Sequence, residues 1–367
     1  MSRARGAQYV QWHPPVMPVA PPHLEHLALA HALPVNEVRT VVAAVRSLRH
    51  GVDRSGAGYY DLVVADASAR IPCKIWGDSR AYAEAARAEL REGMVVKLMC
   101  TVGSFRDAVQ LTVTRLRALS EGDEWQPDAI WGPGWERVEG LRCKTLVFDI
   151  ETVPGIELAQ APAAVVKAID RAAERMDGDV DKVMGLSPYF GKVVSLAFGD
   201  GEAEGPVTAL VVPPPGREQD EYPSWIRPMT EAELLRSFWH LADAAELVVS
   251  YNGRGFDVPF LLMRSLIHGI PARVDLLSSP FSLRPHLDLF RLIGHGRGGL
   301  GSTSLDVICW ALGIESPKGA MDGSMVAPTY ARGDIESIAT YNVADVRATT
   351  AVFRHLREQL LPFRNDW

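Results

Sequence analysis

Short hydrophobic runs separated by turn residues dominate the first third of the chain. Five of these runs have the length and the content of valine, isoleucine and tyrosine that is typical of β-strands. A segment rich in alanine and charge begins at Asp78 or Ser79, ends near Arg91, and predicts a helix between the third and fourth runs. Three strands, a helix and two strands are the order of a five-stranded Greek-key barrel. The runs are residues 38–48, 59–66, 70–76, 94–102 and 108–116.

From residue 141 onward, apolar runs alternate with segments of helical periodicity. The run at 191–199 ends at a glycine turn, so we expect the following run to be its hairpin partner. Strands interleaved with helices predict a mixed α/β sheet as the core of this region. The strand-like runs are residues 146–152, 191–199, 207–212 and 246–251, and the helical patterns cover residues 161–185, 230–244, 259–268 and 335–346.

Two further segments lie outside these patterns. Residues 121–140 contain Trp125, Trp131 and Trp135 among prolines, and we expect a linker whose tryptophans dock against one or both domains. The first 35 residues are rich in proline and predict an unstructured or loosely packed extension. The predicted organisation is an extension over 1–35, a barrel domain over 36–120, a linker over 121–140 and an α/β domain over 141–367.

The chain has no signals for a membrane or for export. No apolar run approaches the roughly 18 residues of a membrane span, and the N-terminus lacks the apolar core of a signal peptide. The four cysteines lie far apart without a C-x-x-C pair, which indicates neither a zinc site nor a disulfide framework. We therefore expect a protein of the reducing cytoplasm that has no membrane partner.

Charge is distributed unevenly along the chain. The formal net charge is -7, which argues against a generally basic nucleic-acid binder. Residues 36–120 nevertheless carry 13 basic and 9 acidic side chains, whereas residues 121–367 carry 23 basic and 35 acidic ones. A basic segment can hold phosphates and an acidic one can hold metal.

Two carboxylates in the first strand of the α/β region are the first candidates for chemistry. Asp149 and Glu151 point to the same side of a strand, while Phe148 and Ile150 point to the other. Two like charges held together are unfavourable unless a cation lies between them, so a divalent metal is a natural partner. On its own such a pair is more often a solvated face, and the functional interpretation requires further carboxylates.

Two later segments supply them. Asp257 follows the strand 246–251 at the start of a helix, where ligands of α/β folds collect. Taken alone, it could equally be a helix N-cap. Tyr341 and Asp345 are four residues apart and share one face of a late helix, although an exposed amphipathic helix is the simpler alternative.

The first domain resembles the OB-fold nucleic-acid-binding domains found beside nucleases and tRNA synthetases. The resemblance lies in residues 59–66, in Ile71–Trp76 and in residues 93–97. Such folds bind oligonucleotides across strands two and three and their flanking loops. Single-strand binding uses aromatic faces for bases and cations for phosphates. The candidates for these contacts are Lys74, Trp76, Phe105 and Arg106, with the alternative that Trp76 is core and the cations are ordinary surface.

The second domain resembles the DEDD (DnaQ-like) exonuclease superfamily over most of residues 141–361. The order D-x-E, then N-G-x-x-F-D, then Y-x-x-x-D matches its three motifs, and the tyrosine four residues before the last aspartate indicates the Y-type (DEDDy) subgroup. The greatest similarity is to predicted exonucleases related to the proofreading domain of family-B DNA polymerases. Supporting stretches are His286–Leu289, Thr303–Asp306, Leu312–Ile314 and Met321–Gly323.

The resemblance implies a ribonuclease H-like fold and a four-carboxylate site. It assigns two divalent ions, Mg²⁺ or Mn²⁺, about 3.5 to 4 Å apart. One ion is shared by Asp149, Glu151 and Asp345, and the second is held chiefly by Asp149, with Asp257 contributing partly through water. Tyr341 is a poor base at neutral pH and is expected to orient the attacking water. The resemblance also implies that Asn252 and Phe256 seat the terminal nucleotide, although Phe256 could equally be core.

These features together predict a metal-dependent 3′–5′ exonuclease acting on single-stranded nucleic acid, with DNA favoured over RNA. Two alternatives stay open: a 3′–5′ exoribonuclease, and a non-catalytic single-strand-binding protein with a nuclease-like domain. DNA repair or replication proteins are candidate partners. The G-x-G-x-x-G sequence over residues 294–299 lacks the surrounding pattern of a dinucleotide site, and we expect a flexible loop there.

Overall fold

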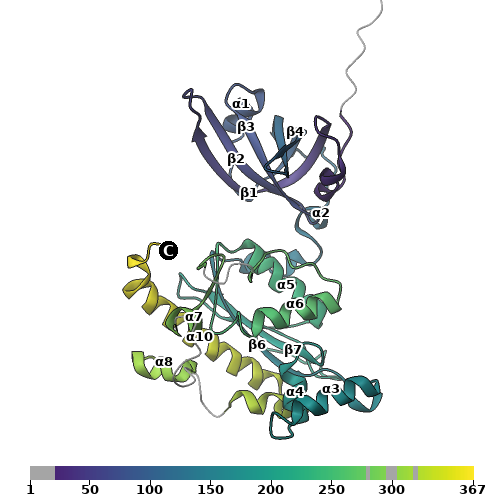
Figure 1. Ribbon diagram of the computed structural model, residues 1–367, viewed down its shortest axis with the longest axis vertical. Helices are drawn as coiled ribbons and strands as arrows, with labels where there is room; N and C mark the ends of the chain where they lie inside the picture. The colour runs from purple at the N-terminus through teal and green to yellow at the C-terminus, as the bar shows by residue number, and fades with distance from the viewer. Residues whose placement is uncertain (1–20, 278–281, 295–303, 317–320) are drawn as a thin grey trace, which may run out of the picture. The chain divides into compact units, whose positions relative to one another are not determined.

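The protein's computed structural model describes residues 21–277, 282–294, 304–316 and 321–367 (Figure 1). The chain divides into two compact units, Met1–Pro133 and Gly134–Trp367. Each unit has its own hydrophobic core. The expected G-x-G-x-x-G loop falls outside the described residues, apart from its first glycine.

The first unit is built on a closed five-stranded barrel with the strand order β1-β2-β3-β5-β4. A short parallel pairing of β3 with β5 closes the barrel, and β1 is long enough to pair with both β2 and β4. Helix α1 (Arg80–Arg87) connects β3 to β4 and is capped by Ser79. This arrangement confirms the predicted OB-fold barrel. The strands are β1 (Val38–Val52), β2 (Gly58–Ala65), β3 (Arg70–Trp76), β4 (Val95–Phe105) and β5 (Ala108–Ala118).

The described part of the N-terminal segment belongs to this barrel. Residues 27–32 form the 3₁₀ helix η1 (Leu27–Ala32), and Leu24, Leu27 and Ala30 are buried in the barrel core. The backbone N–H of Leu27 donates to Oδ2 of Asp66 at 2.7 Å. The expectation of a loosely packed extension is therefore wrong for residues 21–35, because apolar side chains spaced three apart cover the end of the barrel. Residues 1–20 lie outside the described residues.

The segment between the domains is held at both of its ends. Helix α2 (Pro127–Trp131) packs on the first unit, where the N–H of Ala67 donates to the carbonyl oxygen of Ala129 at 2.9 Å. In the second unit, Val138 is buried in the core and Arg137 forms an ion pair with Glu233. The three tryptophans of this segment are all half-buried.

The second unit is a mixed six-stranded sheet in the order β11-β10-β6-β7-β8-β9. Strand β6 is central, with β10 parallel to it on one side and β7 antiparallel on the other. The predicted hairpin of β7 with β8 is present. Two strands of three residues each, β9 and β11, were not predicted. The strands are β6 (Thr145–Pro154), β7 (Gly191–Asp200), β8 (Thr208–Val211), β9 (Ile226–Pro228), β10 (Leu247–Ser250) and β11 (His286–Asp288).

Helices cover both faces of this sheet, as Figure 1 shows for α5, α6 and α10 around β6 and β7. Phe148 and Ile150 of β6 lie in the core shared with α5 and α6, whereas Val147 lies in the core shared with α10. Helix α5 begins with a capping box formed by Thr230 and Glu233. The helices are α3 (Ala163–Ala173), α4 (Val180–Leu186), α5 (Glu231–Ala244), α6 (Asp257–Ile267), α7 (Leu289–Gly294), α8 (Leu305–Leu312), α9 (Val326–Ala331) and α10 (Ile335–Gln359).

None of the described helices is long and apolar enough to cross a membrane. The mixed sheet with flanking helices has the ribonuclease H-like arrangement that was predicted, and α10 packs against β6.

Candidate active site

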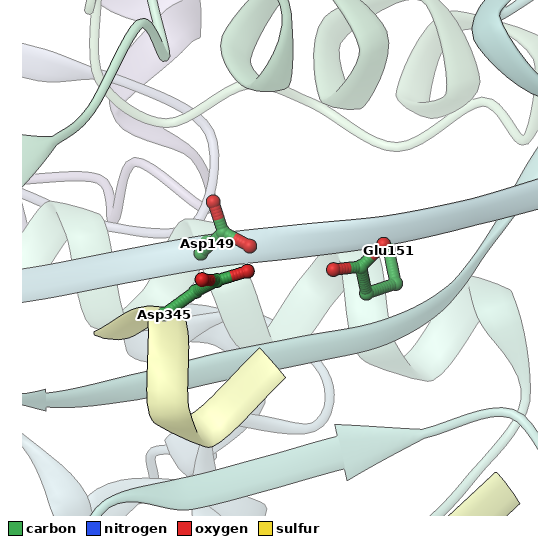
Figure 2. Close-up of side chains that lie close together, drawn as sticks. All are labelled: Asp149, Glu151 and Asp345. Carbon is green, nitrogen blue, oxygen red and sulfur yellow. The ribbon is translucent and has the colours of Figure 1, made fainter. Parts of the chain in front are cut away.

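Three carboxylates from two elements meet beside the central strand. Asp149 and Glu151 project from β6, and Asp345 projects from α10 toward the same space (Figure 2). One oxygen from each carboxylate lies within 4.8 Å of the others, and all three residues are half-buried. Carboxylate oxygens are the ligands that hard divalent cations such as Mg²⁺ prefer. This group can hold a metal ion.

Asp257, the fourth predicted carboxylate, lies next to this group and is buried. It is the first residue of α6, and its Oδ1 accepts a hydrogen bond from the N–H of Ile150 at 3.2 Å. The N-cap of α6 is Phe256, so Asp257 is not the helix N-cap. Its side chain instead reaches across to the strand that carries Asp149 and Glu151.

The carboxylates of this cluster favour protons when no cation is present. Burial, followed by the charges of Asp257, Glu151 and Asp345, raises the pKa of Asp149 well above its usual range. Burial and the same kind of repulsion raise the pKa of Glu151 as well. Burial raises the pKa of Asp257 to about 7. A bound cation would stabilise the ionised forms, and the donor set therefore fits a divalent metal.

A buried amide fixes the orientation of the Asp149 carboxylate. Nδ2 of Asn342, on α10, donates to Oδ2 of Asp149 at 2.7 Å. Oδ1 of the same amide accepts from Oγ of Ser195, on β7, at 2.8 Å. Asn342 and Ser195 are fully buried. The sequence analysis missed both residues, although Asn342 lies three residues before Asp345 and so shares its helix face.

Tyr341 lies at the edge of the same cluster. Burial raises the pKa of its hydroxyl above the ordinary tyrosine range, and the charges of Asp345, Glu151 and Asp149 act in the same direction. A hydrogen bond between the hydroxyl and the Asp345 carboxylate raises the pKa further, so the hydroxyl stays protonated at neutral pH. That Tyr341 orients the attacking water stays a prediction.

The loop between β10 and α6 is held by an acid that was not among the predicted site residues. Oδ1 of Asp288 accepts from the N–H of Asn252, and Oδ2 accepts from the N–H of Arg254, both at 3.0 Å. The loop also packs tightly on β10, because a Cβ at Gly253 would lie 2.2 Å from Oγ of Ser250. Asp288 belongs to the stretch His286–Leu289, which the sequence analysis named only as support for the family resemblance, and it is the last residue of β11.

The two predicted nucleotide-seating residues are on this loop. Asn252 is exposed and has a positive φ of 63°. Phe256 is half-buried and packs on the core, with its ring centroid 5.6 Å from that of Phe260. Phe256 thus makes the core contacts that were considered as an alternative to nucleotide binding, and only part of its ring is accessible.

A second group of predicted residues lies on the barrel of the first unit. Trp76 is 42% exposed and is therefore not part of the core. Nζ of Lys74 lies 4.0 Å from the centroid of the Tyr59 ring and 4.7 Å from the Trp76 ring, and it pairs with Asp61 at 3.1 Å. Tyr59, which the sequence analysis missed, faces Trp76 because the two are register partners of β2 and β3.

The last residue of β4, Phe105, adds a second exposed aromatic ring beside Trp76. Phe105 is 57% exposed, and the guanidinium of Arg106 lies 5.2 Å from the centroid of its ring. Phe105, Lys74 and Trp76 line one groove of about 600 Å³, which Arg106 does not line. The remaining lining residues are Ser47, Arg49, Asp61, Leu62, Val63, Pro72, Cys73 and Gln110. We call this groove the aromatic groove.

Two family comparisons agree with this division of the chain. Residues 226–362 match predicted 3′-5′ exonucleases related to the exonuclease domain of PolB. Residues 39–119 match the OB-fold nucleic acid binding domain family. The chain thus combines an OB-fold domain with a region that matches this family of predicted exonucleases. The match to the PolB-related exonuclease family contains Asp257, Tyr341 and Asp345 but begins after Asp149 and Glu151, which the fold brings to Asp345.

Comparison with solved structures gives similarities of low identity. The family B DNA polymerase from Pyrobaculum calidifontis is 16% identical with a TM-score of 0.41, and the match covers 86% of this chain and 46% of the polymerase. The chain thus spans about half of the length of that polymerase.

Matches to shorter proteins cover about a quarter of the chain. The second OB-fold domain of replication protein A from Methanococcus maripaludis is 16% identical, with 25% of this chain and 93% of that one covered and a TM-score of 0.20. The SSB domain of a Synechococcus sp. protein is 22% identical, with 22% and 92% covered and a TM-score of 0.19. No curated protein matches the chain.

Proposed function

We propose that this protein is a metal-dependent 3′–5′ exonuclease that hydrolyses single-stranded nucleic acid, with DNA as the favoured substrate. The observation that carries the proposal is the cluster of Asp149, Glu151 and Asp345, whose oxygens lie within 4.8 Å of one another in a chain that matches an exonuclease family. The OB-fold domain would capture the strand through its aromatic groove.

Asp149, Glu151 and Asp345 are the residues that would hold divalent cations, with Asp257 beside them. Mg²⁺ or Mn²⁺ ions, two in our proposal, would supply positive charge that activates a water and stabilises the departing 3′ oxygen. The mutual repulsion of these carboxylates favours cation binding, because a cation offsets their negative charges.

The protein's own groups would set the geometry of the reaction. Asn342 donates a hydrogen bond to one oxygen of Asp149 and so fixes the orientation of the carboxylate. The protonated hydroxyl of Tyr341 would donate a hydrogen bond to the attacking water or to the phosphate. Asp288 fixes the loop that carries Asn252, which would contact the terminal nucleotide. Each of these groups acts by orientation, and none must change its protonation state.

The test is the release of nucleotides from oligonucleotides labelled at the 5′ end. Single-stranded DNA, duplex DNA and RNA of one sequence are incubated with Mg²⁺ or Mn²⁺, and the products are resolved by length. We expect ladders that shorten from the 3′ end, fastest for single-stranded DNA, and no reaction in chelator. Faster degradation of RNA would identify an exoribonuclease.

Variants separate a genuine site from contamination. Asp149→Ala and Asp345→Asn should each abolish release while binding of the single strand is retained. Asp181→Asn, which changes an exposed acid on α4, is the matched control and should be fully active. Undiminished hydrolysis by either site variant would refute the proposed site, and inactivity of the unmodified protein on every substrate would favour a non-catalytic binding protein.

A further inference from the structure

A second cavity of the barrel, separate from the aromatic groove, is lined by basic side chains. It has a volume of about 620 Å³ and lies between α1, the first half of β4 and the end of β5. Its cations are Arg80, Arg87, Lys97, Arg115 and Arg117. None of the described residues that line it is aromatic. We call it the basic cavity.

Carboxylates in the basic cavity lie beneath the cations. Glu84 is 12% exposed in its side chain and accepts from Nε of both Arg80 and Arg115, at 3.0 and 2.8 Å. The two arginine side chains are 70% and 45% exposed. Glu84 therefore orients both guanidinium groups through Nε, and their terminal N–H groups are left to face solvent.

Two other cations of the lining share a second carboxylate. The Asp123 side chain is 5% exposed and pairs with Arg117 at 2.5 Å and with Lys97 at 3.3 Å, while the side chains of these cations are 49% and 37% exposed. Among the described residues, Arg87 has no ion-pair partner. Five cations against two covered carboxylates leave a net charge of three, all of it on the solvent side.

The spacing of the cations suits a chain of phosphates. Lys97 and Arg117 are direct partners across β4 and β5, and Arg115 lies two residues from Arg117 on the same face. Two residues of a strand span about 6.7 Å, which is similar to the separation of neighbouring phosphates in a stretched single strand. Arginine forks are suited to phosphate oxygens.

The two leucines of the basic cavity contribute little accessible surface, because Leu98 and Leu116 are only 1% and 3% exposed. The charged groups that a ligand would meet there are those of the five cations. The domain that contains the cavity belongs to a nucleic-acid-binding family. The phosphate backbone of a polynucleotide is therefore the ligand that the chemistry favours.

We propose that the basic cavity is a second nucleic-acid site, which binds the sugar-phosphate backbone without reading bases and extends the site beyond the aromatic groove. The site is independent of hydrolysis and can be present even if the protein has no nuclease activity. If the site exists, it should raise the affinity for long strands but not for short ones, and this gain in affinity should fall as the salt concentration rises.

The experiment measures binding of 5′-labelled oligothymidylates by the full-length protein in chelator, so that no strand is cleaved. Oligonucleotides of about 6 and about 30 nucleotides bracket the length that one OB-fold binds. The test variant is Arg80→Gln with Arg87→Gln. The matched control is Lys167→Gln with Arg171→Gln, which removes the same charge from exposed positions of α3. Melting temperatures establish that each variant is folded.

We expect the test variant to bind the long strand about tenfold more weakly and the short strand normally. The slope of log affinity against log salt for the long strand should fall by about 1.4, because each lost phosphate contact removes about 0.7. Arg80→Lys with Arg87→Lys should restore this slope. Trp76→Ala should weaken both lengths, which distinguishes the aromatic groove from the basic cavity.

Three results would overturn the proposal. The first is an equal loss of affinity for both strand lengths in the test variant, and the second is no loss of affinity at either length. The third is a loss of affinity that the α3 control variant also shows. Competition decides the class of ligand. Inorganic polyphosphate should abolish the advantage of the long strand, and if polyglutamate does so where polyphosphate does not, the cavity is a site for an acidic protein.

Discussion

Asn342 Nδ2 lies 2.7 Å from Oδ2 of Asp149 and joins the last long helix to the central strand of the sheet. The amide is itself held by Ser195, so its oxygen and nitrogen cannot exchange places without breaking both bonds. Its hydrogen bond lowers the pKa of Asp149, whereas burial and three neighbouring charges raise it. Asn342 therefore acts as a positioning residue for a metal-binding carboxylate.

Removal of this amide should weaken the metal site. Asn342→Ala is expected to raise the half-saturating Mg²⁺ concentration, or to lower activity, by about 10- to 100-fold, as found for residues that orient metal ligands. Ser195→Ala should have a smaller effect in the same direction. The measurement is the initial rate of nucleotide release across a Mg²⁺ titration. Asn365→Ala, an exposed position, is the control, and an Asn342 variant with an unchanged titration curve would exclude the positioning role.

The metal-free protein should lose stability as pH rises. The folded state raises the pKa of Asp257 to about 7 and those of Asp149 and Glu151 well above their usual range, so it binds protons more tightly than the unfolded chain. Stability from this source is fully present below about pH 4 and is lost as pH rises toward 7 and beyond. Carboxylates with lowered pKa values, such as Glu231, act below this range and in the opposite sense.

Thermal melts in chelator at pH 5, 6, 7 and 8 measure this effect. Asp149→Asn should flatten the decline and be more stable than the unmodified protein at pH 8, by roughly 1 to 3 kcal/mol. Saturating Mn²⁺ should restore the stability of the unmodified protein at high pH, because a ligand that binds the folded state stabilises it by mass action. The melting temperature of the variant should stay almost unchanged. A melting temperature that rises from pH 5 to 8 in chelator would contradict the clustered, proton-binding carboxylates.

Local periodicity was sufficient to predict which site residues lie together on a single strand or a single helix. Alternation along a strand places Asp149 and Glu151 opposite Phe148 and Ile150, and this is how β6 divides its side chains between the two cores. Helical spacing likewise places Tyr341 with Asp345. The order of hydrophobic runs was enough to predict the barrel, because each strand of a small barrel must alternate between core and solvent.

Features that depend on how two elements meet could not be predicted in this way. The contact of Ser195 with Asn342 requires the register of β7 and the rotation of α10, which no local pattern contains. Asp288 lies on a strand of three residues, too short for a period to show. The predicted helix over 161–185 is two helices, α3 and α4, because Asp177 and Gly178 have positive φ angles of 56° and 80°, and this Asp-Gly pair was an available turn signal.

Asp288 offers a test of the loop between β10 and α6. Asp288→Ala would leave the N–H groups of Asn252 and Arg254 without their acceptor, which should cost about 1 to 3 kcal/mol of stability for each group left buried. If Asn252 seats the terminal nucleotide, KM for a single strand should rise more than kcat falls. Asp288→Asn retains one acceptor oxygen and should be intermediate. Steady-state kinetics and urea unfolding of each variant distinguish this outcome from a loss of folded protein. An unchanged KM would contradict a role of this loop in substrate binding.

The position of the Lys74 ammonium against the rings of Tyr59 and Trp76 predicts two distinguishable losses of binding. Trp76→Ala should weaken binding of a short oligothymidylate by about 1 to 3 kcal/mol, the usual effect of one lost base stack, without changing its salt dependence. Lys74→Gln should reduce the salt slope by about 0.7, because the lysine would contact a phosphate. Phe363→Ala removes an aromatic ring that is 84% exposed in the other unit, and it controls for general surface effects. Because Lys74 already pairs with Asp61, its loss should be the smaller of the two in affinity at physiological salt. A Trp76 variant that binds normally while the Lys74 variant fails would show that the groove holds the strand by charge alone.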